Sequence, residues 1–323
     1  MGAIIIDTIP AQRKLREAPD LTPTRSERRM NRLVPKITEK RCKTALTKSG
    51  MRYTYAINPY TGCLHACVYG YCTFMRRFSG HMEDAWGSFV DVKVNLIEVL
   101  GKELPRRDGG SVWISSVCDP YQQLEAKYKL TRGALQLLSQ HPQFTISILT
   151  KNALVLRDLE VLQQMKDRVE VGFTITTFDS DAQRIFEPHA STVAQRINAV
   201  KQLSAAGIRT WVFVAPMLPF ATEVQLEEGL RRLAAEGVKH LETDRFNARA
   251  SVINPTLEAY KTWNPSLDLE EIRELLWRGD EYYHTLETKI SNLWRSMTPD
   301  ATYARDLDYE KLRQEKQVEK ESK

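Results

Sequence analysis

Hydrophobic and polar residues follow two different periods along this chain, and the two periods alternate. Short apolar runs rich in β-branched residues predict strands, and longer stretches with apolar residues three and four positions apart predict helices. The predicted strands are residues 53–58, 112–117, 145–150, 169–176, 209–215 and 238–242. The predicted helices between them are residues 92–104, 131–139, 153–165, 192–206 and 224–236.

This alternation determines the expected class of fold. Gly207 and Gly237 follow two of the predicted helices, at the position where glycine commonly ends a helix. Repeated strand–helix units favour a parallel sheet with helices packed outside it, as in an open or closed barrel. In such barrels ligands gather on the loops that follow the carboxyl ends of the strands. We therefore expect an α/β fold whose functional residues lie in those loops.

Composition narrows the class of protein. The chain has 323 residues, of which 42% are hydrophobic and 27% are charged, as in a soluble globular protein of one large or two small domains. It contains no apolar run of about 18 residues, the length of a membrane span. Its opening, MGAIIIDTIPAQRK, turns polar too soon for a secretory signal. Five cysteines in such a chain indicate a reducing compartment, and we expect a cytoplasmic protein that does not contact membranes.

The positive charge is concentrated near the N-terminus. Residues 1–50 hold twelve Lys or Arg and five Asp or Glu, an excess of seven, whereas the whole chain has a net charge of +5. Clustered cations are typical of surfaces that bind nucleic acid, so this basic arm is a candidate site for that partner. The alternative is a solvated extension, because no aromatic residue interleaves the charges before Tyr53.

The densest chemistry lies in residues 58–72, which read NPYTGCLHACVYGYC. Cys63, Cys67 and Cys72 fall within ten residues. Thiolates at this density bind zinc or an iron–sulfur cluster, and three protein ligands leave one coordination position open. One alternative is a structural zinc site that adds His65 to complete a Cys3His set. Residues two apart, such as Cys63 and His65, rarely converge on one ion, and the chain has no second pair of ligands.

This loop resembles that of the radical S-adenosylmethionine (SAM) enzymes, and within them that of the spore photoproduct lyase-like family. The family's run resembles GCxHxCxYCYA, and the matching residues are Gly62, Cys63, His65, Cys67, Tyr69 and Tyr71. Gly70 stands where the family has its third cysteine, and Cys72 follows two residues later. We expect Cys72 to be the third ligand, with Gly70 supplying the backbone freedom to present it. The alternative is a degenerate relative that lacks a working cluster and acts as a binding protein.

Further segments match the same family in order and spacing. They are SSVCDPYQQLEAKY, residues 150–152, FTITTFD and VAPMLP, so that the resemblance covers residues 53–220. It implies a partial (β/α)6 TIM-like barrel, which we place at residues 51–244. A basic extension would precede the barrel at residues 1–50. A C-terminal segment, residues 245–323, would cover the barrel mouth with a helix from Leu269 to about Trp294 and end in a charged tail.

The resemblance also implies cofactors and site residues. A [4Fe–4S] cluster would be bound by Cys63, Cys67 and Cys72, and S-adenosyl-L-methionine would complete its fourth iron. The residues implied to bind the cofactors are Tyr69, Tyr71, Ser116, Asp119, Lys151 and Thr174. Lys151 could pair with the methionyl carboxylate. Each of these residues taken alone could also have an ordinary structural role, such as a surface charge, a turn former or a strand residue.

The reaction that the resemblance implies is lyase-like radical chemistry on an unidentified substrate, with a nucleic acid lesion or a nucleotide as one class. It requires an external electron donor of the flavodoxin or ferredoxin type. In spore photoproduct lyases a cysteine of the second loop returns a hydrogen atom to the product, and Cys118 is the candidate here. Counting back from Asp119 places the family's donor position on Ser116 instead. Cys118 could equally be a small buried residue.

Overall fold

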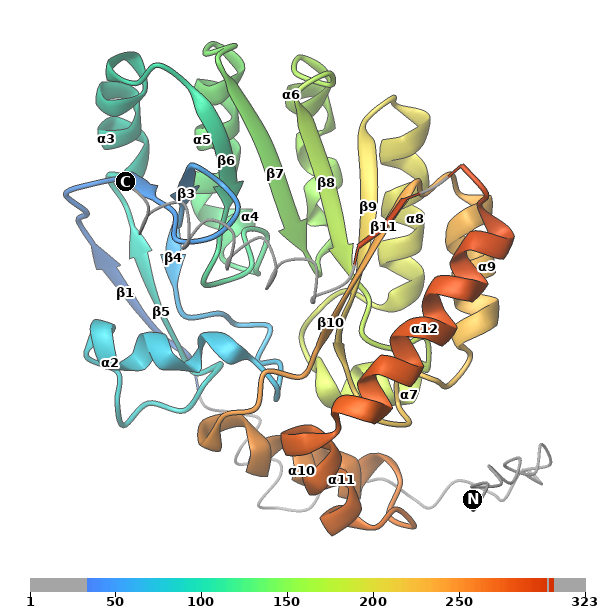
Figure 1. Cartoon of the computed structure of the whole chain (residues 1–323). Helices are drawn as coiled ribbons and strands as arrows, with labels where there is room; N and C mark the ends of the chain where they lie inside the picture. The colour runs from blue at the N-terminus through green and yellow to red at the C-terminus, as the bar shows by residue number, and fades with distance from the viewer. Residues whose placement is uncertain (1–33, 301, 305–323) are drawn as a thin grey trace, which may run out of the picture. The chain divides into compact units, whose positions relative to one another are not determined.

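The computed structural model describes residues 34–300 and 302–304 (Figure 1). Within this part of the chain, eight strands form one sheet in the order β11-β10-β9-β8-β7-β6-β3-β2. Their bounds are β2 Leu46–Lys48, β3 Tyr55–Ile57, β6 Gly110–Ile114, β7 Phe144–Thr150, β8 Val169–Thr174, β9 Arg209–Met217, β10 His240–Arg245 and β11 Thr302–Ala304. The run from β3 to β10 is parallel and follows chain order. The predicted α/β partial TIM-like barrel is confirmed.

Helices follow the strands of this barrel, and Figure 1 shows α5, α6, α8 and α9 along one face of the sheet. The helices of the barrel are α3 Leu96–Glu103, α4 Glu125–Tyr128, α5 Leu130–Ser139, α6 Leu159–Gln163, α7 Ser180–Phe186, α8 Val193–Ala205 and α9 Leu226–Ala235. Short 3-10 helices are η1 Tyr71–Met75, η2 Leu104–Arg106 and η3 Ala153–Asp158, and α2 Arg76–Ser79 continues from η1. After β10 come α10 Ala250–Trp263, α11 Leu269–Arg278 and α12 Asp280–Met297.

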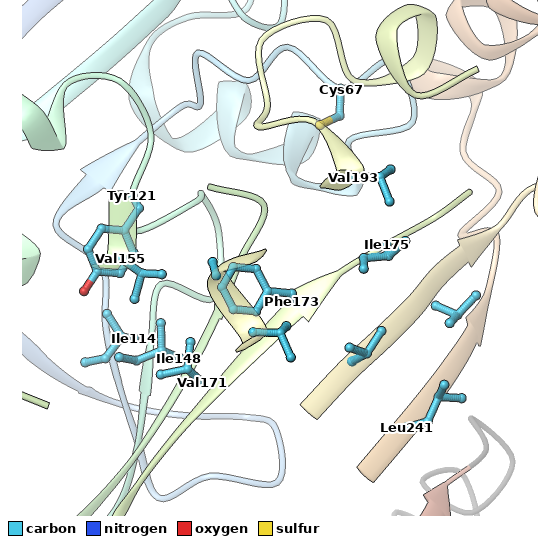
Figure 2. Close-up of a cluster of buried hydrophobic side chains, with 14 of the residues drawn as sticks. Cys67, Ile114, Tyr121, Ile148, Val155, Val171, Phe173, Ile175, Val193 and Leu241 are labelled. Atoms are coloured by element: carbon cyan, nitrogen blue, oxygen red, sulfur yellow. The ribbon is translucent and has the colours of Figure 1, made fainter. Parts of the chain in front are cut away.

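Alternate strand residues form the core between sheet and helices. Ile148 of β7 and Val171 and Phe173 of β8 are fully buried. Figure 2 shows them beside Val155, with Cys67 at the edge of the same cluster. Burying a side chain of this size stabilises the fold by about 1.5–3 kcal/mol. The cysteine loop is therefore seated on a rigid core.

A second sheet has the strand order β1-β5-β4. Its strands come from the same part of the sequence as the barrel strands β2, β3 and β6. Its strands are β1 Lys36–Lys40, β5 Phe89–Lys93 and β4 Tyr60–Thr61. β1 and β2 thus come from the segment that was expected to be a basic extension. The residues of that segment before 34, and the predicted charged tail after 304, lie outside the described residues. Within the residues that the structure places, no helix has the length and apolar character needed to cross a membrane.

Two predicted helix boundaries were wrong. The helix expected at residues 92–104 begins only at Leu96, because Val90 and Val92 belong to β5, which pairs with strands on both sides. A short apolar run buried on both faces has no period that separates strand from helix. The long helix expected from Leu269 is divided at Gly279, where a Cβ would lie 2.4 Å from the Leu275 carbonyl oxygen.

Candidate functional site

The three clustered cysteines lie in the segment that follows β3 and β4. Cys63 and Cys67 lie in the loop after β4 and Cys72 lies in η1, with 7%, 8% and 7% of their surfaces exposed. Burial raises the pKa of Cys67 and of Cys72 to about 12, and the charge of Cys63 raises both further. Cys63 therefore acts electrostatically on both Cys67 and Cys72, and all three thiols are buried away from water. Deprotonating Cys67 and Cys72 requires a strong compensating positive charge, such as that of metal ions.

The cysteine loop is clamped from two sides. Gln122, fully buried after β6, accepts from the backbone N–H of Leu64 at 3.0 Å and donates to the Gly62 carbonyl at 3.1 Å. On the other side the N–H of Val68 donates to the carbonyl of Phe186 at the end of α7, at 3.0 Å. The backbone of the loop is thus fixed by side-chain and main-chain partners from two different barrel units.

Gly70 has a different function from the one expected. Its φ of −58° and ψ of 99° are open to most residues, so the expectation that this glycine supplies backbone freedom was wrong. A Cβ at this position would instead lie 2.6 Å from Nε1 of Trp86. Glycine is required at residue 70 because the Trp86 indole fills the adjacent space. Cys72 lies two residues further along, with its Sγ 3.9 Å from the Ser116 carbonyl oxygen.

A buried ionic network lies under the loop. Glu187 and Arg196 form an ion pair with 1% and 0% of their side chains exposed. The Tyr69 hydroxyl donates to Glu187 and lies 3.0 Å from Oγ1 of Thr176. Arg196 donates through Nη1 to the Thr174 carbonyl at 2.8 Å. Two predicted cofactor residues, Tyr69 and Thr174, therefore have polar groups engaged within the protein.

Lys151, at the end of β7, faces this network. Its Nζ lies 5.7 Å from the centre of the Tyr69 ring. Burial disfavours the charged amine, but interactions with Cys67, Glu187 and Asp119 outweigh burial and raise the pKa of Lys151 above its ordinary value. This residue therefore places a permanent cation beside the cysteine loop.

The Asp119 carboxylate is fully used inside the protein. Oδ1 accepts from the Tyr121 N–H at 2.8 Å and the Thr150 hydroxyl at 2.7 Å, and Oδ2 accepts from the Lys151 N–H at 2.7 Å. Burial disfavours the charge, but the neighbouring His65 outweighs it and holds the pKa of Asp119 at about 2. This carboxylate ties the loop after β6 to the end of β7.

His65 lies in the same buried corner. Its Nδ1 lies 3.4 Å from Oδ2 of Asp119, and its Nε2 lies 3.3 Å from Nδ2 of Asn152. In the described ranges 34–300 and 302–304, no three His, Cys, Asp or Glu side chains form a set that could hold one metal ion. Because both imidazole nitrogens face other side chains, His65 is not placed as the fourth ligand of a zinc site.

Ser116, Tyr71 and Cys118 surround the cysteines on the β6 side. The Tyr71 hydroxyl donates to the Ser116 carbonyl at 2.7 Å, and Oγ of Ser116 lies 3.2 Å from Nδ2 of Asn58. Cys118 is half-buried, and its Sγ lies 3.4 Å from the Tyr60 carbonyl oxygen. Burial, and then the charges of Cys63 and Cys72, raise the pKa of Cys118. Cys118 therefore shares the site with the three loop cysteines.

Several residues of the site had no signal in the sequence. Trp86, Glu187 and Arg196 belong to no spaced motif, and Gln122 lies in the matched segment SSVCDPYQQLEAKY without being singled out. Their contacts join positions that are from 9 to 118 residues apart. Their common feature is a polar or aromatic side chain buried next to the cysteine loop. Only the folded chain places them there.

Comparison with known proteins identifies the family. The model of the radical SAM superfamily matches residues 57–233, more than half of the chain. The chain belongs to the radical SAM superfamily. Superfamily membership implies a [4Fe–4S] cluster and SAM as cofactors, and three buried thiols from one loop beside a cation are a donor set that suits them.

Relatives within this superfamily cover different shares of the chain. The uncharacterized protein MJ0683 of Methanocaldococcus jannaschii is 36% identical over 171 residues, which are 53% of this chain and 63% of that protein. The chain thus spans less than two thirds of that relative. The uncharacterized protein Rv2578c of Mycobacterium tuberculosis is 31% identical over 256 residues, 74% of this chain and 73% of that protein.

Solved structures share the fold of this radical SAM protein. A spore photoproduct lyase complexed with dinucleoside spore photoproduct matches with a TM-score of 0.62 and 20% identity, over 90% of this chain and 87% of that chain. A mutant of the lyase with bound AdoMet and the same dinucleoside matches with a TM-score of 0.62 and 19% identity, over the same shares. At this identity the likeness concerns the fold.

Proposed function

We propose that this protein is a radical SAM enzyme that binds a [4Fe–4S] cluster through Cys63, Cys67 and Cys72 and uses SAM to abstract hydrogen from its substrate. One observation supports the proposal: Cys63 and Cys67 of the clamped loop and Cys72 of the following η1 are all buried within ten residues of the chain. When bound, these cofactors supply one-electron chemistry, the reductive cleavage of SAM to a 5′-deoxyadenosyl radical.

The side chains around the loop orient SAM and exclude water. Lys151 would pair its ammonium with the methionyl carboxylate of SAM, because it is a cation that interacts with Cys67. Ser116 and Tyr71 form the β6 side of the cofactor pocket, joined by their hydrogen bond. Tyr69, Asp119 and Thr174 act as positioning residues, because their polar groups hold the loop, the Lys151 backbone and Arg196.

Cys118 is the proposed hydrogen donor to the product radical. Its thiol lies on the loop after β6, beside Cys63 and Cys72, and burial keeps it protonated. A protonated S–H is the form that can give a hydrogen atom. Ser116, the family's donor position by register, instead holds Tyr71 through its carbonyl oxygen.

A nucleic acid lesion or a nucleotide is the proposed class of substrate. The support is the fold, which matches that of a lyase solved with a dinucleoside photoproduct. The chain's basic N-terminal arm suits a phosphate-bearing substrate.

Anaerobic purification, cofactor analysis and a cleavage assay test the proposal. We expect about four irons and four sulfides per chain on cluster stoichiometry, and release of 5′-deoxyadenosine from SAM under reductant. Cys72→Ala should abolish both signals. Cys42→Ala, in a cysteine between β1 and β2, is the matched control and should keep both. Wild-type protein that holds neither iron nor sulfide after anaerobic reconstitution would support the binding-protein alternative.

A further inference from the structure

An aromatic stripe runs outward from the cysteine site along η1 and α2. It consists of Tyr71, Phe74 and Phe78, spaced three and four residues apart and therefore on one face of a helical segment. The Phe74 and Phe78 rings meet edge to face, with centroids 6.4 Å apart. Tyr71 is 41% exposed and Phe78 is 77% exposed. The stripe begins at the neighbour of Cys72 and ends in solvent.

Two arginines flank this aromatic stripe, and one exposed carboxylate, Glu83, lies next to Met82 at its far end. The Arg249 guanidinium lies over the Phe74 ring at 5.3 Å, and its charge also acts on the Cys72 thiol. Arg77 is exposed beside Phe78 on α2. Met82, 52% exposed, extends the apolar surface past the end of α2.

Such a surface has the composition of a protein docking site. Grouped exposed apolar side chains rimmed by polar residues mark interaction surfaces. Aromatic residues, Met and Arg are the types enriched at the energetic centres of protein interfaces. A partner that covered the exposed ring of Phe78 would remove apolar surface from water, which is favourable.

We propose that the aromatic stripe, with Arg77 and Arg249, is the docking surface for an acidic one-electron carrier protein. This rests on the proposed function, because the carrier's partner is the cluster held by Cys63, Cys67 and Cys72. With the cluster bound, the carrier would lose one electron and the cluster would gain it, and that electron would be consumed in the cleavage of SAM. The flanking arginines attract an acidic carrier and orient it over the stripe.

The stripe fits a carrier better than a nucleic acid. A bound nucleic acid neutralises an extended row of cations, commonly about 6–10 phosphate contacts. Here only a few charged residues lie beside the stripe, and its apolar side chains are close together, as at the apolar centre of a protein–protein interface. The stripe also starts beside Cys72, which gives a docked carrier a short path to the cluster.

Comparing two reductants tests the proposal. SAM cleavage by the reconstituted holoenzyme is measured with dithionite and, separately, with a reduced acidic flavodoxin. In Phe78→Ala and Arg77→Glu we expect the KM for flavodoxin to rise at least tenfold, with the dithionite-driven rate and the iron content unchanged. Added salt should raise the wild-type KM for flavodoxin and affect Arg77→Glu less. The controls are Met51→Ala and Arg107→Glu, exposed residues before the amino ends of β3 and β6.

The outcomes separate this inference from the proposed function. No cleavage with dithionite in wild-type holoenzyme refutes the proposed function, and flavodoxin binding to the immobilised variants then still tests the docking surface. An unchanged KM and unchanged flavodoxin binding in both variants overturn the docking surface alone. Loss of binding to a labelled single-stranded oligonucleotide, with flavodoxin kinetics intact, would also overturn it and assign the stripe to nucleic acid.

Discussion

The indole of Trp86 occupies the space that a side chain at Gly70 would need. The distance from Nε1 of Trp86 to an ideal Cβ on Gly70 is 2.6 Å, closer than real Cβ contacts, and the ring lies edge to face with Phe89 at 6.1 Å. The placement of the third cysteine at residue 72 and the presence of Trp86 are therefore two parts of one arrangement.

The first prediction concerns this pair. In a Cys72→Ala background, Gly70→Cys should fail to restore iron binding, because the new side chain collides with Trp86. Adding Trp86→Ala should restore a substantial part of it by freeing that space. Iron and sulfide content after anaerobic reconstitution measure the result. Full recovery of the cluster by Gly70→Cys with Trp86 in place would show that the indole is no obstacle.

The second prediction concerns Lys151. Lys151→Ala should weaken SAM binding about 10–100-fold, as expected when a charged hydrogen bond of about 1.5–3 kcal/mol is lost. Lys151→Arg should retain part of the affinity. Iron content should not change in either variant. Calorimetric titration of the holoenzyme with SAM gives the affinities, with Lys166→Ala on the exposed turn before β8 as the control. Equal affinities for all variants would exclude Lys151 from the SAM site.

The third prediction concerns Cys118. Because its thiol lies beside the cysteine set but outside the loop, Cys118→Ala should keep the cluster and the release of 5′-deoxyadenosine. With a substrate in hand, hydrogen return to the product should be lost, as seen in the transfer of deuterium from D2O. A loss of iron in Cys118→Ala would instead identify this cysteine as a ligand.

The fourth prediction concerns the buried ion pair of Glu187 and Arg196. Glu187→Gln should lower the free energy of unfolding by about 3–5 kcal/mol, since it leaves a buried guanidinium without its counter-charge. Urea denaturation at neutral pH measures the loss. Glu228→Gln, in an exposed pair with Arg231 on α9, should change it by less than about 0.5 kcal/mol.

The same pair gives a pH dependence. Burial opposes ionisation of Glu187, but the charge of Arg196 outweighs burial and leaves the pKa below its ordinary value. The pair therefore contributes its stability above the unfolded pKa of about 4.3 and loses it as the pH falls toward the lower folded value. The stability difference between wild type and Glu187→Gln should therefore begin to shrink as the pH falls below about 4.3 and go on shrinking toward the lower folded pKa. A gap that stays constant down to pH 3 would contradict this assignment.

The sequence by itself predicted the barrel and singled out the cysteine loop as the candidate metal site. β7 and β8 were predicted within two residues at either end because their apolar runs match a strand buried against helices. Three cysteines in ten residues are a local pattern, and a local pattern can be recognised in the sequence without knowledge of the fold. Where local patterning was ambiguous, as in β5 and at Gly279, prediction failed.

Tertiary structure decided what surrounds that loop. Gln122 reaches Gly62 across 60 residues and Tyr69 meets Glu187 across 118, and neither pairing leaves a period or spacing in the sequence. The space beside Gly70 depends on where Trp86 packs, which no property of either residue specifies. A strand or a cysteine cluster follows from neighbours along the chain, whereas the clamp on the loop and the filled space beside Gly70 follow from which distant segments the barrel brings together.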